Sequence, residues 1–162
     1  MNTVAQCLIL SCGNTLRMDD GIGPFLSKWA EWQFRADARI RVLTCHQWTP
    51  ELAVDLAGAA TALFVDCAVN LRPGEVHVRA LEAGQLKPTS GINTHQSGAS
   101  ELLAMARDYY ASLPRRSLLL TVGAGSVELG EEFSSAVAAA IPRAQQQIKE
   151  AVASLLALSD TT

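Results

Sequence analysis

Three aspartates and one histidine are the residues of this chain best placed for chemistry. Asp19 and Asp20 are neighbours in a glycine-punctuated stretch, residues 13–23, whereas Asp66 ends an apolar run and His95 follows a long irregular segment. Two carboxylates and an imidazole make an oxygen/nitrogen site that suits a divalent transition ion such as nickel or zinc. Three protein ligands leave coordination positions open for substrate or water. The pattern therefore predicts a metal site of Asp20, Asp66 and His95, with Asp19 bonding backbone amides in the turn.

The stretch 13–23 does not have the pattern of a nucleotide-binding loop. A dinucleotide-binding fingerprint needs three closely spaced glycines, but Gly13 and Gly21 are separated by polar and charged residues. A P-loop would need a Gly-Lys-Ser/Thr sequence, and two adjacent acids would repel a phosphate. The acids suit a cation, or proton transfer to and from water.

Each candidate residue also has a purely structural interpretation. Asp20 alone would be a turn residue or a helix cap, and Asp66 could cap a following turn. His95 alone would more often be a structural hydrogen-bond donor. All three are expected at the same edge of a sheet, and this shared location favours one site over three coincidences.

Other polar residues have weaker claims to function. His77 alternates with charged neighbours in a strand-like pattern, which indicates a solvated edge position. His46 follows a strand-like run, so a structural role and contact with a substrate are both open. Arg17 could steer an acidic substrate segment, or could simply be exposed.

Apolar runs and helical patterns alternate along the chain. Strands are expected at residues 7–12, 40–45, 61–67, 75–81 and 117–122, and helices from Pro24, Thr49, about residue 102 and Ser134 or Ser135. Pro142 is expected to kink or split the last helix. The short link after residue 67 suggests a hairpin, so that residues 75–81 run antiparallel at a sheet edge. The order predicts an α/β fold, a three-layer α/β/α sandwich with a mostly parallel, twisted sheet. Right-handed crossovers would gather the loops after the parallel strands along one edge.

Composition narrows the class of protein. The chain has 162 residues, 49% of them hydrophobic, which fits a single ordered domain over residues 1–162 with frayed residues 158–162. The net charge is −3 and there is no basic block, which argues against nucleic acid or an anionic membrane as partner. The apolar runs are too short to cross a bilayer, and no basic residue precedes the first of them, so a cytoplasmic location is expected. The protein is also expected to be a monomer. The four cysteines form no Cys-x-x-Cys pair, which favours free thiols over a disulfide framework.

The stretch 13–23 resembles the signature of the hydrogenase maturation proteases, a strand followed by Gly-Asn-x-Leu-x-x-Asp-Asp/Glu-Gly-x-Gly. Every fixed position is present. Thr-Pro-Glu-Leu at 49–52, the aspartate that ends the third strand, and Thr-His-Gln at 94–96 extend the resemblance over residues 7–142. Two departures are Cys67, where the family more often has alanine, and a weak match over residues 122–128.

The resemblance implies an aspartic-type endopeptidase that trims the large subunit of a nickel–iron hydrogenase. Asp20, Asp66 and His95 match the family's metal-binding residues, and so would complete the coordination of nickel in a loaded precursor and serve as catalytic residues. The bond just beyond the precursor's metal-binding cysteine motif would be cut, releasing a C-terminal extension and activating the hydrogenase. Nickel would arrive with the substrate, so the resting enzyme is expected to be metal-free.

Several mechanistic alternatives stay open at the level of the residues. The metal could polarise the scissile carbonyl or activate a bound water, or a carboxylate could activate the water. Cys67 could be a nucleophile, but neighbours on a strand point to opposite faces, which favours a buried cysteine. A serine hydrolase is disfavoured because the chain has no Gly-x-Ser-x-Gly elbow. The alternative function is a non-catalytic nickel-sensing chaperone or metal-binding module of hydrogenase assembly.

Overall fold

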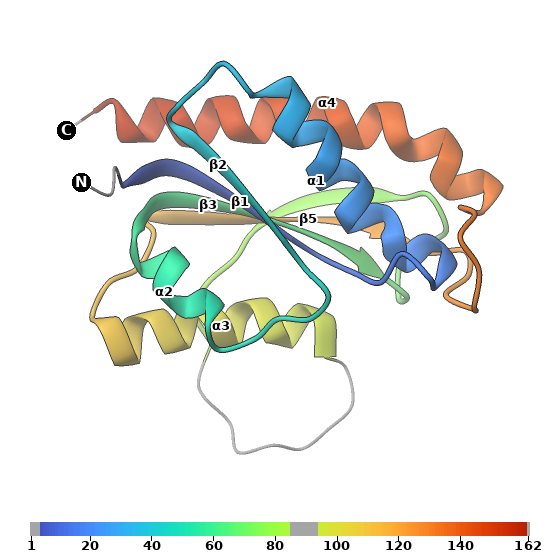
Figure 1. Ribbon diagram of the computed structural model, residues 1–162, viewed down its shortest axis with the longest axis horizontal. Coiled ribbons are helices and arrows are strands. Elements are labelled where there is room, and N and C mark those ends of the chain that lie inside the picture. The colour runs from blue at the N-terminus through green and yellow to red at the C-terminus, as the bar shows by residue number, and fades with distance from the viewer. Residues whose placement is uncertain (1–3, 85–93, 162) are drawn as a thin grey trace.

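A five-stranded sheet in the order β2-β1-β3-β5-β4 forms the centre of the computed structural model (Figure 1). The structure describes residues 4–84 and 94–161, and for residues 94–97 only the backbone. The strands are β1 (Ala5–Cys12), β2 (Ile40–Cys45), β3 (Ala59–Ala68), β4 (Val76–Ala80) and β5 (Arg116–Gly123). All neighbouring strands pair in parallel except β4, which is antiparallel to β5. The predicted mostly parallel sheet with one antiparallel edge strand is confirmed.

Helices cover both faces of this sheet. In Figure 1, α1 (Ile22–Gln33) and α4 (Ser135–Ser159) lie above the sheet, and α2 (Leu52–Ala57) and α3 (Thr94–Tyr110) lie below it. A short 3-10 helix, η1 (Met18–Gly21), leads into α1. The predicted three-layer α/β/α sandwich is therefore confirmed.

Alternation along the strands divides the core into two layers. On β3, Val65 and Cys67 belong to the core beneath α1 and α4. Phe64 belongs to the core against α2 and α3. Because successive strand residues face opposite sides, Asp66 lies on the same side as α3, and Cys67 is buried on the other side with 5% exposure.

The pairing of β4 corrects one prediction. A hairpin between the strands at 61–67 and 75–81 was expected, but β4 pairs with β5, and β5 lies between β3 and β4. This arrangement gives β3 a parallel partner on each side, and every residue of β3 except Ala60 is buried. A strand that is apolar on both faces is typical of such an interior position.

Pro142 was expected to kink or split the last helix. It does not split it, because α4 runs continuously from Ser135 to Ser159. The carbonyl of Ala138, which Pro142 cannot bond, belongs to an exposed residue where water can satisfy it. Tyr109 and Tyr110 follow Leu102, Leu103 and Ala106 at helical spacing on α3, but their exposed fractions are 71% and 49%. They lie in the last turn of α3, where the sheet no longer covers them.

No helix within residues 4–84 and 94–161 combines the length and the apolar character needed to cross a membrane.

Candidate active site at the carboxyl edge of the sheet

Three neighbouring parallel strands place a row of reactive side chains at their carboxyl ends. Cys12 of β1 is the register partner of Cys45 of β2. Ser11 of β1 pairs with Val65 of β3, so the next position sets Cys12 beside Asp66. The row Cys45, Cys12 and Asp66 lies on the face that α2 and α3 cover, because each residue alternates with the strand residues of that core layer.

The stretch 13–23 folds into a compact turn immediately beyond β1. A Cβ at Gly23 would overlap the carbonyl oxygen of Cys12, and a Cβ at Gly13 would overlap the carbonyl oxygen of Asp20. Both glycines are therefore required by close backbone approach. The turn brings η1, which carries Asp19 and Asp20, against β3.

Asp19 connects this turn to the loop between β5 and α4. Its buried carboxylate accepts hydrogen bonds from the backbone N–H groups of Gly125, Ser126 and Ser134 at 2.7, 2.9 and 2.7 Å, and from the Ser134 hydroxyl at 2.7 Å. Burial alone would raise the pKa of Asp19, but these hydrogen bonds outweigh burial and lower it. Asp19 does bond backbone amides, as predicted, but they belong to a distant loop and not to its own turn.

The Asp19 contacts are part of a wider junction between the two loops. Met18 donates its N–H to the Gly130 carbonyl at 2.7 Å, and Gly130 donates to the Leu16 carbonyl at 2.9 Å. Met18 has a positive φ of 43°, a strained conformation for a residue with a side chain. The junction thus holds the turn that carries Asp20 in a defined shape.

Backbone amides orient the two candidate carboxylates. Asn14 donates its N–H to Asp20 Oδ2 at 2.8 Å, and Cys67 donates its N–H to Asp66 Oδ1 at 2.8 Å. Both carboxylates also act on one thiol, that of Cys67. Burial raises the pKa of this thiol most, and the charges of Asp20 and Asp66 add to the effect, which brings it to about 12. The structure therefore brings Asp20 and Asp66 into one neighbourhood at the carboxyl edge.

The backbone of His95 lies in the first turn of α3, and its side chain is outside the described residues. The start of α3 packs on the same face of the sheet as the row described above, because Ala99 is buried in the layer that contains Phe64. Trp48 contacts Gly98 and stacks edge-on against Phe64, with ring centroids 5.5 Å apart. Among the side chains that the structure describes, no group of three His, Cys, Asp or Glu is arranged to hold a metal ion. The metal site of Asp20, Asp66 and His95 stays a prediction.

The Cys12 and Cys45 thiols form a pair that the sequence analysis missed. Cys12 Sγ donates to the His46 carbonyl and Cys45 Sγ donates to the Ser11 carbonyl, each at 3.3 Å. The neighbouring thiol raises the pKa of Cys12, which burial raises further, and lowers the pKa of Cys45. The sequence shows only that each cysteine ends a strand-like run, and the register between the two strands, which brings them together, comes from the structure.

Three further polar residues lie outside the row. His77 is exposed on the edge strand β4 and contacts Glu75 at 2.8 Å, as expected of a solvated position. His46 is exposed, and its described contact is made by its backbone carbonyl. Arg17 is exposed and donates through Nε to the Val127 carbonyl at 3.0 Å, so it belongs to the junction between the loops.

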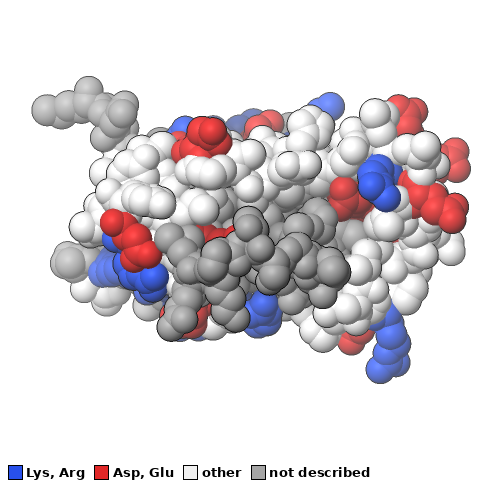
Figure 2. All heavy atoms as spheres, turned by 90° about the horizontal axis from the view of Figure 1, so that it is seen from below, with Lys and Arg blue, Asp and Glu red and all other residues white. Residues whose placement is uncertain are grey.

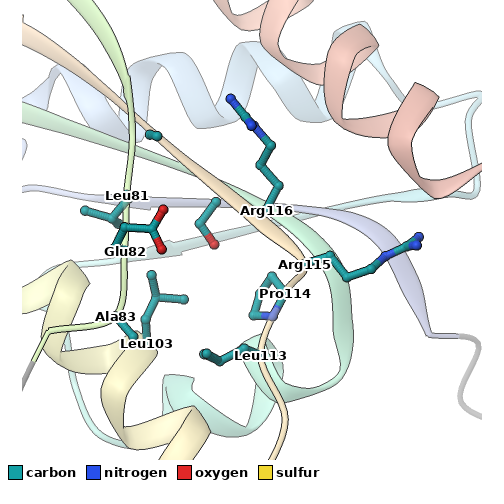
Figure 3. Close-up of a pocket in the computed structure, with 10 residues that line it drawn as sticks. Leu81, Glu82, Ala83, Leu103, Leu113, Pro114, Arg115 and Arg116 are labelled. Carbon is teal, nitrogen blue, oxygen red and sulfur yellow. The ribbon is translucent and has the colours of Figure 1, made fainter.

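The surface around this edge is acidic. Glu128, Glu131 and Glu132 are exposed in the loop that Asp19 holds, and Figure 2 shows acidic side chains gathered at the right-hand end of the molecule. A cavity of about 120 Å³ lies at the opposite edge, where β4 ends and β5 begins, between Leu81, Leu103 and Pro114 (Figure 3). That cavity is too small for most organic ligands and is remote from the candidate carboxylates.

Solved structures of hydrogenase maturation proteases have the same fold as this chain. The hydrogenase maturating endopeptidase HybD from E. coli matches with a TM-score of 0.74 and 22% identity, over 92% of this chain and 93% of that chain. The [NiFe] hydrogenase maturation protease HybD from Thermococcus kodakarensis matches with a TM-score of 0.64 and 26% identity, over 90% and 97% of the two chains. The maturation protease HycI from Thermococcus kodakarensis KOD1 gives 0.63 and 21%, over 94% and 92%. No protein-family model and no curated protein matches the chain.

These matches confirm the resemblance that the motifs of residues 13–23 and 94–96 predict. They span nearly the whole chain and nearly the whole of each solved structure. The predicted class of enzyme, a peptidase, is confirmed with the resemblance.

Proposed function

We propose that this chain, a peptidase with the fold of the hydrogenase maturation proteases, removes a C-terminal extension from a nickel-loaded hydrogenase large-subunit precursor. One observation supports this most directly. The turn with Asp20, the strand end with Asp66 and the first turn of α3 all occur at the same edge and on adjoining elements. A single domain, a monomeric enzyme and a cytoplasmic location belong to the same proposal.

In this proposal, Asp20, Asp66 and His95 recognise the nickel that the precursor carries. Carboxylate and imidazole donors suit a divalent ion of this kind. The backbone N–H groups that bond Asp20 and Asp66 orient each carboxylate before the substrate arrives, as outer-shell partners do at metal sites. An oriented pair loses less conformational entropy when the substrate binds.

The same carboxylates would keep the Cys67 thiol from competing for the metal. A cysteine binds a metal as the thiolate, and burial together with Asp20 and Asp66 raises the pKa of Cys67 to about 12. Cys67 also lies on the other face of the sheet from Asp66. Both facts argue against Cys67 as a ligand or a nucleophile.

Proteolysis requires a water molecule to attack the scissile carbonyl beside the bound nickel. A carboxylate of this edge could take the proton from that water, and the precursor's nickel could polarise the carbonyl. Asp20 is the better placed of the two acids in the turn for this chemistry, because the carboxylate of Asp19 is already committed to four hydrogen bonds.

The test is cleavage of a cognate large-subunit precursor, with and without nickel, followed by mass spectrometry of the product. Loss of the C-terminal extension from the loaded precursor alone is the expected result. Asp20→Asn, Asp66→Asn and His95→Gln should each abolish cleavage while leaving the far-ultraviolet circular dichroism unchanged. Matched controls are Asp108→Asn on α3 and His77→Gln on β4, which remove the same functional groups from exposed positions and should cleave normally.

Other outcomes would separate the alternatives. Cleavage that ignores nickel would keep the peptidase but reject Asp20, Asp66 and His95 as nickel ligands. Nickel-dependent binding without cleavage would favour the nickel-sensing chaperone.

A further inference from the structure

We propose that Cys12 and Cys45 form a dithiol site that low-molecular-weight disulfides oxidise to an internal disulfide bond at the carboxyl edge. All four cysteines are free thiols in the structure. The proposal concerns a covalent modification site beside the candidate carboxylates.

The register of the sheet places the Cα atoms of the two cysteines within the range of a disulfide. Cys12 and Cys45 are Cα partners on adjacent parallel strands, which lie about 4.8 Å apart in a sheet. That spacing is inside the range of about 4.4–6.8 Å seen between the Cα atoms of disulfides. Both side chains point to the same face, and each thiol donates to a carbonyl on the other strand or just beyond it.

The other two cysteines cannot take part. Cys7 and Cys67 belong to the core layer beneath α1 and α4, on the opposite face of the sheet from Cys12 and Cys45. The fold therefore selects one pair from the four cysteines.

Exposure sets the order of the two reaction steps. Cys45 is partly exposed and Cys12 is completely buried. The Cys45 thiolate attacks an external disulfide RSSR, which forms Cys45–S–SR and releases one RS⁻ that takes up a proton. Cys12 then loses its proton and attacks the Cys45 sulfur, which forms the Cys12–Cys45 bond and releases the second thiol as RSH. Two cysteine thiols are oxidised, and one external disulfide is reduced to two thiols.

The bond would form at the base of the turn that carries Asp20. Gly13 donates its N–H to the Cys45 carbonyl at 3.1 Å, and Gly23 packs against the Cys12 carbonyl. Pulling the two strand ends together therefore displaces both ends of the turn. This consequence rests on the proposed function: oxidation should slow precursor cleavage by about tenfold, since small displacements at reacting groups cost rate steeply.

The test uses the full chain, reduced and then exposed to oxidised glutathione. Trypsin leaves Cys7 with Cys12 in one peptide and Cys45 with Cys67 in another, so peptide mass alone cannot assign the bond. The variant Cys7→Ala/Cys67→Ala retains only the proposed pair, and Cys12→Ala/Cys45→Ala retains only the other two. Free thiols are alkylated after unfolding and then counted by mass spectrometry.

The expected result is an internal disulfide in the Cys7→Ala/Cys67→Ala variant, with a mass lower by about 2 Da and full reversal by dithiothreitol. The Cys12→Ala/Cys45→Ala variant should form none. Cys45→Ser alone, which keeps a hydrogen-bonding group at this position, should also fail to cross-link. Two free thiols in the first variant after oxidation, with native circular dichroism, would overturn the proposal.

These readouts need no enzyme activity, so they are independent of the proposed function. If the disulfide forms and cleavage of the loaded precursor is unchanged, the effect on the Asp20 turn is wrong. If the reduced protein does not cleave, the proposed function fails while the disulfide result stands.

Discussion

Replacing Asp19 by asparagine tests whether the link between the two loops stabilises the fold. The carboxylate is fully buried and accepts three hydrogen bonds on Oδ2 and one on Oδ1. An asparagine whose oxygen takes the Oδ2 position keeps three acceptor contacts. Its amide nitrogen then faces the Ser134 N–H, and two donors oppose each other.

The direction of the pKa shift fixes the sign of the effect. The pKa of Asp19 is lowered in the folded state, so the hydrogen bonds favour the charged form by more than burial disfavours it. Removing the charge is therefore destabilising. Three bonds each lose about 1 kcal/mol of charge assistance, and the unpaired N–H of Ser134 costs about 1–3 kcal/mol more. After partial relief of the burial cost of the charge, we expect a loss of about 3 kcal/mol in the free energy of unfolding.

Urea unfolding followed by circular dichroism measures this loss. About 3 kcal/mol corresponds to a fall of about 6–12 °C in Tm for a chain of this size. The depressed pKa also predicts a pH dependence: the stability that Asp19 contributes is present above the ordinary aspartate pKa, near 4, and is lost as pH falls through the folded pKa. The gap between wild type and Asp19→Asn should be constant at neutral pH and close below about pH 4.

Asp20→Asn is the matched control for this experiment. Asp20 is partly exposed and accepts one described hydrogen bond, from Asn14, so its replacement should cost about 1 kcal/mol or less. Equal urea midpoints for Asp19→Asn and wild type would refute the reasoning, because they would show that the buried charge is not needed to hold the loop.

Three other predictions follow from the same structure. Gly23→Ala should lower the free energy of unfolding by about 2–3 kcal/mol, because the added Cβ overlaps the carbonyl oxygen of Cys12 on β1. In Gly58→Ala the added Cβ meets only ordinary contacts, so the free energy of unfolding should stay within about 0.5 kcal/mol of wild type. Similar unfolding midpoints for the two variants would contradict this. At pH 8, iodoacetamide should modify Cys45 well before Cys67, because the neighbouring Cys12 thiol lowers the pKa of Cys45, whereas burial and the nearby carboxylates raise that of Cys67 to about 12. Equal rates at the two cysteines, located within their shared tryptic peptide by fragment-ion mass spectrometry, would contradict these environments. Trp48→Ala removes the edge-on aromatic contact with Phe64, whose ring centroid is 5.5 Å away. The free energy of unfolding, measured by thermal unfolding, should fall by about 2 kcal/mol. An unchanged Tm would show that this contact does not stabilise the fold.

The layers and strand directions could be predicted because they depend on local patterns. Continuous apolar runs indicated buried strands, and Pro24 and Ser134 marked helix starts. Ser134 is indeed the N-cap of α4, since its hydroxyl accepts the Val137 N–H at 3.4 Å. The partner of β4 could not be predicted in this way, because a short link is compatible with a hairpin and only tertiary packing shows that β5 comes between.

The candidate site shows the same division. Asp66 was singled out because an acid at the end of an apolar run is unusual, and Asp20 because it lies in the glycine-punctuated stretch 13–23. The metal site that they would form with His95 stays a prediction. The role of Asp19 was only half predicted, since its partners lie more than a hundred residues away in sequence. The Cys12–Cys45 pair was missed because it depends on the register between two strands, which no single stretch of sequence specifies.

The position of β5 also has a consequence for synthesis of the chain. Until residues 116–123 have left the ribosome, β4 has no strand to pair with, and β3 has a partner on only one side. The nascent sheet β2-β1-β3 therefore presents an open apolar edge from the emergence of β3 until that of β5, and such edges promote aggregation. A stop codon before residue 116 should accordingly yield insoluble fragments, whereas trimming the last residues after α4 leaves every strand pair intact.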